Sequence, residues 1–353
     1  MNADSLHDDA PHSLSTRLIV AILVIVVSVP VLGLALWTAR EALKPLTERS
    51  DVQVFSLTFL SIVFEALPFI LVGALLSGLL EMFVSRRRML QLIPRSRFAQ
   101  LLVGATMGVC LPVCECGVVV VLRRLLKKGM PLGMALAYLL VAPIVNPVVI
   151  ASTFAAFRGK PEWLFMPLAR VGFGIAIGVA VAAVVGRGRA REWIKPDARE
   201  DDTQDADPHA SLGPGQKVSA ACDHAVSEFL GVIPFLIAGA LIAAAIQTAL
   251  PRTAMNAVSG NPVLSVLGMM ALAVGLNLCS EADAFVAAGL LSFTAVAKLA
   301  FLVLGPMFDI KLLVMYGSVF RRSLIWRLVA AILVAVFVVM ALLAFAERLW
   351  FGG

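Results

Sequence analysis

The chain has 353 residues, of which 60% are hydrophobic and only 15% are charged. A soluble globular domain is closer to half apolar and a quarter charged, so the composition predicts an all-α polytopic membrane protein. The formal net charge of +6 comes from basic residues that cluster between apolar runs. That distribution sets membrane topology and does not indicate nucleic-acid binding.

The five cysteines and four histidines of the sequence restrict its chemistry. Four cysteines lie in apolar segments and Cys222 lies just before one, which is not the pattern of a secreted disulfide scaffold. The histidines lie in or beside polar segments, so a histidine-based metal site within the membrane is not expected. We expect no cofactor, and whether the cysteines hold a metal is left open.

The first apolar run, residues 18–37, follows an acidic leader. A signal peptide has a positive leader and a shorter apolar core, so we interpret residues 1–54 as an uncleaved anchor helix with its loop. We expect a cytoplasmic N-terminus. A full span needs about 20 apolar residues, and the further candidate segments are 55–83, 98–126, 131–156, 164–186, 224–249, 262–292, 296–320 and 324–346.

Two of these segments are interrupted in the middle. Segment 98–126 contains Pro112, and segment 262–292 contains the polar stretch from Asn277 to Asp283. Proline removes a helical hydrogen bond and clashes with the preceding turn. The segments that follow the interrupted ones also contain prolines: Pro143, Pro147 and Pro306.

The basic residues indicate how the interrupted segments cross. Arginine and lysine concentrate in 84–97, 123–130 and 187–217, which predicts that all three loops are cytoplasmic. Segment 98–126 would then enter the membrane from the cytoplasmic side and return to it as a re-entrant hairpin of two half-helices. Segment 262–292 would be a second hairpin that enters the membrane from the outer side. The alternative is that both segments cross the membrane fully.

The chain contains an internal duplication. Pro68 to Leu75 resembles Pro234 to Leu241, Cys114 matches Cys279, and Pro143 matches Pro306, in the same order and at nearly constant separation. The halves are 55–186 and 218–353, joined by 187–217. The part 196–217 is acidic and rich in Asp, Pro and Gly, which predicts a flexible cytoplasmic linker. One hairpin and three spans in each half give an inverted-topology repeat with broken helices, which is typical of transporters.

The cysteines gather at the predicted breaks. Cys110, Cys114 and Cys116 flank Pro112, and Cys279 lies in the matching stretch of the second half. Thiolates are soft ligands, suited to Cu(I), Zn(II) or, by analogy, trivalent arsenic. Buried cysteines are also small hydrophobic residues that pack well, and this alternative stays open. We predict a substrate site made of Cys110, Cys114, Cys116, Cys279, Asn146 and Asp309.

Ionisable residues inside the membrane segments are energetically unfavourable unless they are paired or hydrated. We predict that Glu65, Glu115, Glu281 and Asp283 couple transport to proton uptake, because a poorly hydrated cavity favours the neutral form of a carboxylate. The alternative is that such acids form ion pairs, for example with Lys311.

The motifs also support a resemblance to a known family. Cys114-Glu-Cys116-Gly-Val-Val, the run from Lys128 to Ala135, and Ala142-Pro-Ile-Val-Asn146-Pro147 resemble the YraQ-type predicted permeases. That family includes the ArsP organoarsenical efflux permeases, and its members often have a serine where this chain has Glu115. The resemblance covers most of the chain from about residue 55 onward and implies a permease.

The predicted function is therefore a secondary transporter for efflux of a small solute such as a metal, metalloid or organoarsenical. The chain contains no GxxxxGK[ST] phosphate-binding loop that would indicate ATP hydrolysis. The alternatives are a membrane thiol oxidoreductase using Cys114 and Cys116, and a lipid-headgroup flippase. The expected location is a bacterial-type inner membrane. The expected partners are the lipid bilayer and a small solute or ion, not nucleic acid, and a homo-oligomer stays open.

Overall fold

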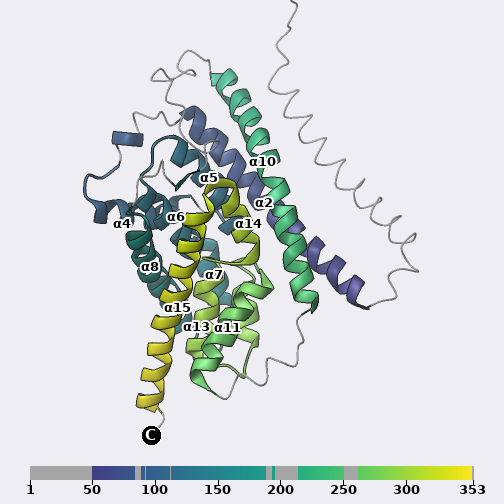
Figure 1. Ribbon diagram of the computed structural model, residues 1–353, viewed down its shortest axis with the longest axis vertical. Coiled ribbons are helices and arrows are strands. Elements are labelled where there is room, and N and C mark those ends of the chain that lie inside the picture. Colours follow the sequence, from purple (N-terminus) through teal and green to yellow (C-terminus); the bar gives the residue numbers. More distant parts are fainter. Residues whose placement is uncertain are drawn as a thin grey trace, which may run out of the picture.

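The computed structural model describes residues 50–83, 89–91, 93–111, 113–187, 193–194, 214–249 and 261–351 (Figure 1). The predicted anchor 18–37, the residue Pro112 and most of the predicted linker 187–217 lie outside the described residues. The named elements of the described residues are all α-helices. Residues Ile194 and Phe320 also form an isolated β-bridge.

The described residues of the first half include the helices α2 (Ser50–Phe83), α4 (Arg97–Cys110), α5 (Glu115–Lys127), α6 (Leu132–Val145), α7 (Pro147–Ala156) and α8 (Phe165–Val185). Those of the second half include α10 (Pro214–Ala249), α11 (Pro262–Leu276), α12 (Asp283–Gly289), α13 (Ala295–Leu304), α14 (Ile310–Val319) and α15 (Arg322–Phe351). In Figure 1 the long helices α2 and α10 lie against each other on one side of the bundle, where they pack along their lengths.

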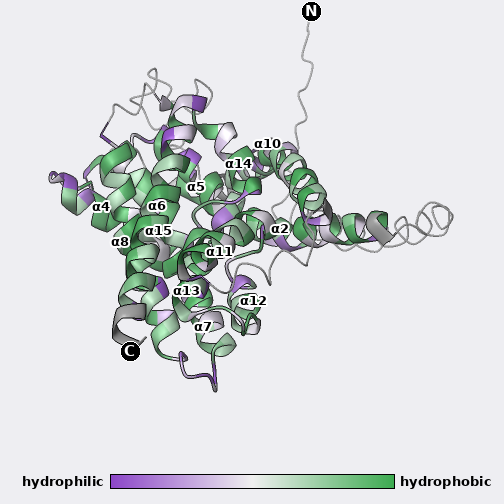
Figure 2. Ribbon diagram, turned by 60° about the horizontal axis from the view of Figure 1, so that its bottom comes forward, coloured by the Kyte–Doolittle hydropathy of each residue, from purple (hydrophilic) through white to green (hydrophobic). Residues whose placement is uncertain are grey.

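The prediction of an all-α polytopic membrane protein is confirmed. Within the described residues, five helical stretches are long and apolar enough to cross a membrane: Val52–Glu81, Leu132–Ala156, Phe165–Val185, Ser219–Thr248 and Arg322–Glu347. Figure 2 shows the helices coloured as hydrophobic over most of their lengths, with the hydrophilic residues mainly at the ends of the bundle and at a few interior positions.

The predicted breaks are present, and local chemistry explains each one. Helix α4 ends at Cys110 and α5 begins only at Glu115. Asn146 separates α6 from α7, where its side chain accepts a hydrogen bond from the Val148 amide and Pro147 occupies the first helical position. Asn277 ends α11 in the left-handed conformation, with φ 48°, which asparagine tolerates better than most residues.

The first broken segment returns to the end of the bundle from which it started. Gly117 of α5 packs against Gly73 of α2, and Lys128 donates to the Leu80 and Glu81 carbonyls near the end of the same helix. Helix α5 therefore runs parallel to α2. The start of α4 and the chain at Pro131 line one cavity, so both ends of the segment lie together. This arrangement is compatible with the hairpin that the charge pattern predicts, and its course across a membrane stays a prediction.

The second broken segment opens toward the opposite end. Helix α8 starts beside the loop that contains Lys160 and ends at Gly186, which packs against Gly133 near the start of α6. Its 21 residues separate these ends by about 31 Å. The Lys160 ammonium donates to the Ala288 carbonyl at the end of α12. We call the end with Lys128 and Gly186 the inner end and the end with Lys160 the outer end, following the positive-inside prediction.

Two matched glycines bring the long helices against the breaks. A Cβ atom on Gly73 would lie 2.9 Å from Gly117 Cα, and one on Gly239 would lie 3.0 Å from Lys311 Cα. Small residues permit such close approach between helices in a membrane bundle. Gly73 and Gly239 therefore shape the helix packing, and both positions set the backbone beside groups described below.

The linker prediction needs a correction at its end. Helix α10 begins at Pro214, so residues 214–217 of the predicted linker are helical. Proline is well accommodated in the first turn of a helix, because its missing N–H would have no partner there. Within the linker, the Trp193 carbonyl also accepts the Arg321 amide at 2.9 Å, which ties that short stretch to the inner end of α15.

Candidate functional site

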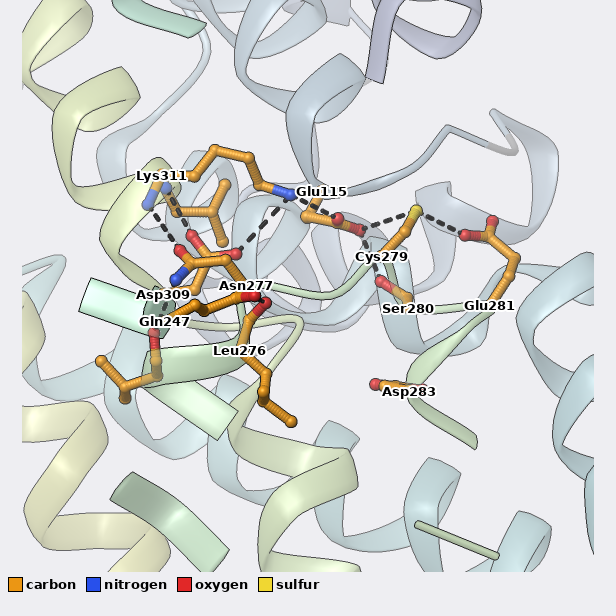
Figure 3. A network of polar contacts seen from close by, with 12 residues as sticks. Glu115, Gln247, Leu276, Asn277, Cys279, Ser280, Glu281, Asp283, Asp309 and Lys311 are labelled. Atoms are coloured by element: carbon orange, nitrogen blue, oxygen red, sulfur yellow. Dashed lines mark hydrogen bonds and ion pairs between the residues drawn. The ribbon is translucent and has the colours of Figure 1, made fainter. Parts of the chain in front are cut away.

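The tips of the two hairpins meet through Glu115. This residue occupies the first turn of α5, directly after the first break. Its Oε2 accepts a hydrogen bond from the Ser280 hydroxyl at 2.5 Å, and Ser280 belongs to the turn before α12. Figure 3 shows the two side chains pointing toward each other from the two breaks. The contact joins positions that are 165 residues apart in sequence.

Lys311 supplies the cation of this network. Its ammonium lies 3.3 Å from Glu115 Oε1 and 3.7 Å from Asp309 Oδ2. Asp309 also accepts the Leu312 amide at 2.5 Å and so caps the start of α14. A carboxylate at a helix N-terminus is favoured by the amides exposed there. The same residue thus fixes the helix that carries Lys311 and helps to balance its charge.

Asn277 connects the second break to α14. Its side-chain oxygen accepts the Lys311 backbone amide at 2.9 Å, and its amide group donates to the Val274 and Gly275 carbonyls at 3.0 Å. These contacts satisfy backbone groups that the end of α11 leaves without helical partners. Asn277 therefore holds the unwound backbone of the tip in place.

Cys114 and Cys116 flank Glu115 in the chain, and Cys279 reaches its carboxylate from the second break. The three thiols are close enough to influence one another electrostatically. Cys279 donates to Glu281 Oε2 at 2.7 Å, and its sulfur lies 4.0 Å from Glu115 Oε2. Cys279 of the second break thus lies beside Glu115 of the first break, and a shared substrate site stays a prediction. Within the part of the chain that the structure describes, no group of three or more His, Cys, Asp or Glu residues could hold a metal ion.

We call this set the central network, and its members are Cys114, Glu115, Cys116, Asn277, Cys279, Ser280, Glu281, Asp309 and Lys311. All except Glu281 have an exposed fraction of 4% or less. Buried charges are tolerated only when they are paired and hydrogen-bonded. The Glu115–Lys311 pair and the Ser280 hydroxyl meet that requirement, so the network is stable while closed to solvent.

A second buried ion pair lies beside the network. The Arg170 guanidinium of α8 is 1% exposed and lies 2.8 Å from Asp283 Oδ2. It also donates to the Ser280 carbonyl at 3.0 Å and to the Thr153 hydroxyl at 2.8 Å. Arg170 therefore links α7 and α8 of the first half to the turn that carries Ser280. We call these contacts, together with the Lys160–Ala288 hydrogen bond, the outer latch.

A cluster of ion pairs at the inner end holds α5 against both long helices. Arg124 lies 3.6 Å from Glu81 of α2 and 3.4 Å from Glu228 of α10. Lys128 lies 3.2 Å from Glu81, and Arg123 lies 3.7 Å from Glu228. We call these contacts the inner latch. The inner latch lies at the inner end of the bundle, whereas the outer latch runs from the central network to the outer end, and each one fastens a hairpin arm to the other half of the chain.

The remaining predicted site residues lie at different distances from the network. Asn146 donates to the Val113 carbonyl at 3.5 Å, next to the network, while its oxygen caps α7. Glu65 of α2 is partly buried and interacts electrostatically with Lys311, Glu115 and Glu281. Asp283 pairs with Arg170. Cys110 is exposed at the end of α4 and contacts no network residue within the described chain.

Sequence reasoning missed three of the charged or polar groups. Arg170 lies inside the apolar segment 164–186. A charged side chain there is energetically unfavourable unless it is paired, so its position alone indicates a partner. Ser280 lies inside the second break, and Glu228 inside the apolar segment 224–249. The location of these three residues in or beside apolar segments could have identified them. Their partners come from distant parts of the chain, so no spacing pattern reveals the partners.

Comparison with known proteins gives a consistent result. The family model ArsP_1, described as predicted permease, matches residues 52–345. The chain is 39% identical to the UPF0718 protein YcgR of Bacillus subtilis over 296 residues, which cover 82% of this chain and 97% of that protein. It is 37% identical to a putative two-component membrane permease complex subunit of Streptococcus mutans over 273 residues, 77% of this chain and 88% of that protein. No solved structure matches the chain.

Proposed function

The chain belongs to this family of predicted permeases, and from that premise we propose that it is a secondary transporter whose solute passes the tips of the two hairpins. The contact between Glu115 and Ser280 carries this proposal. It brings two broken helices from opposite ends of the bundle to one polar point. Broken helices that meet at the centre of a membrane bundle are the usual site for substrate and coupling ion.

The chemistry of the central network supports a small solute that binds soft ligands. Three thiols and one carboxylate face each other there, and both kinds of group bind cations and metalloids. The substrate class we propose is a metal, a metalloid or an organoarsenical, moved outward. Cys114, Cys116 and Cys279 would bind it, with Asn146 and Asp309 supporting the unwound backbone.

Glu115 and Lys311 supply a means of coupling. In the conformation described here they neutralise each other inside the bundle. A proton on Glu115 would leave Lys311 with Asp309 as its counter-ion and would release the tip of the first hairpin. Glu281, Asp283 and Glu65 surround this pair and would relay the proton. Protonation of Glu115 has a small free-energy cost only if the Lys311 ammonium keeps one carboxylate partner. Asp309, 3.7 Å away, is that partner.

The latches give the proposed transporter two gates. The inner latch holds α5, and the outer latch holds the turn before α12 and the end of that helix. Both are closed in this structure, as in the occluded state of an alternating-access cycle. The inverted repeat is part of the same proposal. Two halves of opposite orientation would place equivalent gates on opposite sides of the membrane.

A membrane thiol oxidoreductase is the second candidate, favoured by the contacts that Cys114 makes with two other thiols. The relative from Streptococcus mutans is named as a subunit of a two-component complex, so this chain could also act with a second membrane protein. Family membership favours transport over enzyme activity.

Everted membrane vesicles that contain the full chain test the proposal. A thiol reagent should label Cys114 and Cys116, and Cu(I), Zn(II) or a trivalent arsenical that is the substrate should protect them. The same solute should accumulate when a pH gradient is applied, and Glu115→Gln should abolish that accumulation. A disulfide that forms and reopens without solute movement would support the oxidoreductase instead. Normal accumulation by Cys114→Ser/Cys116→Ser would contradict the proposed site.

A further inference from the structure

A cavity of about 480 Å³ opens at the inner end, away from the central network. It lies between the start of α4, the start of α6 and the end of α8. Its lining combines apolar and basic side chains, among them Arg97, Phe98, Leu101, Leu132, Ala183 and Arg187. None of its lining residues belongs to the central network or to either latch.

Close contact between α6 and α8 forms one wall of the cavity. A Cβ atom on Gly186 would lie 2.5 Å from Gly133 Cα, and both glycines line the cavity. Because the two backbones touch there, they leave no passage between them. Helix α4 stands beside this contact and completes the space, so the cavity is a recess in the surface of the bundle.

The cavity is positively charged. Arg97 and Arg187 are both exposed at its rim, and no acidic residue lines it. Neither arginine has an ion pair with an acid in the described chain. Helices α4 and α6 also begin here, and the positive ends of their dipoles add to the potential. The potential favours an anion with several oxygen acceptors.

The cavity lies where the apolar runs of its helices end, which is the level expected for lipid headgroups. The apolar run of α8 ends at Val185, one residue before Gly186, and that of α4 begins at Phe98. Exposed apolar residues then continue along one face of α4 at Phe98, Leu102 and Val109. These positions span about 17 Å of helix, which suits the contact of one acyl chain.

We propose that this cavity binds the phosphate headgroup of an anionic glycerophospholipid, with an acyl chain along α4. The two arginines hold the phosphate oxygens, because guanidinium groups match them in geometry and charge. Basic recesses between membrane helices on the cytoplasmic side are suited to such headgroups. The site does not depend on the transported solute. A lipid bound there would anchor the first hairpin at the inner end, where α4 begins.

Binding can be measured by native mass spectrometry of the purified full-length protein in detergent, titrated with dioleoyl phosphatidylglycerol or dioleoyl phosphatidylcholine. Wild type should retain phosphatidylglycerol in preference to phosphatidylcholine. Arg97→Gln/Arg187→Gln should weaken phosphatidylglycerol binding about 25-fold, since each basic side chain near an anionic headgroup contributes a factor of about five. The matched control is Arg321→Gln/Arg322→Gln, which removes two exposed arginines at the same end but outside the cavity.

A second variant, Ala183→Trp, fills the cavity while keeping both arginines, and it should lower retention as well. This variant decides the case if the double glutamine variant does not fold. Equal loss in the control pair, or unchanged binding in the cavity variants, would overturn the proposal. So would competition by inorganic phosphate that displaces phosphatidylglycerol at equal concentration, because the site would then be one for free phosphate.

Discussion

The two hairpin arms that follow the breaks, α5 and α12, occupy the same place in the order of elements but are fastened in different ways. Helix α5 has 13 residues and is held by several ion pairs with Glu81 and Glu228. Helix α12 has 7 residues and is held mainly by one fully buried arginine, Arg170, at its start. The long helices also differ, because α2 packs on α5 whereas α10 packs on α14.

The halves therefore share several contacts, such as α4 with α6 and α11 with α13, but differ in how the long helix and the hairpin arm are fastened. The inner latch spreads its charge over several ion pairs, in which Arg123 and Glu81 are partly exposed, so that losing one leaves others. The outer latch concentrates its charge in one buried pair. Breaking a buried pair costs more than breaking a partly exposed one. The outer latch should therefore respond more strongly to a single substitution.

Loss of Arg170 should have the largest effect. Arg170→Gln leaves Asp283 buried without its cation, and we expect a destabilisation of about 3–5 kcal/mol, seen as a large drop in the thermal unfolding temperature in detergent. Arg170→Met/Asp283→Leu removes both charges and should recover much of the loss. If the double variant is no more stable than Arg170→Gln, the buried charge is not the cause.

Loss of Glu228 should have a smaller effect. In Glu228→Gln, Arg124 keeps Glu81 as a partner, so we expect about 2 kcal/mol of destabilisation in the same assay. Glu81→Gln/Glu228→Gln removes both acids and should cost more than the two single changes combined. Strict additivity would show that the inner latch is not one coupled cluster.

Thiol accessibility distinguishes the two ends. Arg170→Lys keeps the charge but loses the forked geometry that reaches both Asp283 and the Ser280 carbonyl. Membrane-impermeant maleimide added from outside should then label Cys279 faster, by about tenfold for each 1.4 kcal/mol lost by the closed state. Glu228→Gln should speed labelling of Cys116 from the inner side only. Equal acceleration from both sides in both variants would contradict separate gates.

Cys110 should matter least. Because it is exposed at the end of α4, Cys110→Ser should change stability by no more than about 0.5 kcal/mol and transport by no more than about twofold. Cys222→Ser is the matched control, since Cys222 also lies outside the network. A loss of transport in Cys110→Ser comparable to that of Cys114→Ser would restore Cys110 to the site.

The sequence predicted the broken helices because Pro112, Asn277 and Asp309 have local effects that depend on few neighbours. It also predicted that cysteines from both breaks would meet, since the duplication relates Cys114 to Cys279. It could not give the partners of Glu115. Ser280 and Lys311 reach that carboxylate only after 165 and 196 residues of intervening chain have packed. The same limit hid Arg170, whose partners depend on how α8 faces the second hairpin.

The meeting of the two tips at the central network is the claim on which the account depends. The direct test is a variant that retains only Cys114 and Cys279, treated with dibromobimane, which fluoresces when it joins two nearby thiols. We predict bright fluorescence, because Cys279 lies 4.0 Å from the carboxylate of Glu115, the residue that follows Cys114, and we predict that a variant retaining only Cys110 and Cys279 stays dark. Equal darkness of both, with the Cys114 and Cys116 pair still reacting in its own variant, would contradict the meeting of the tips.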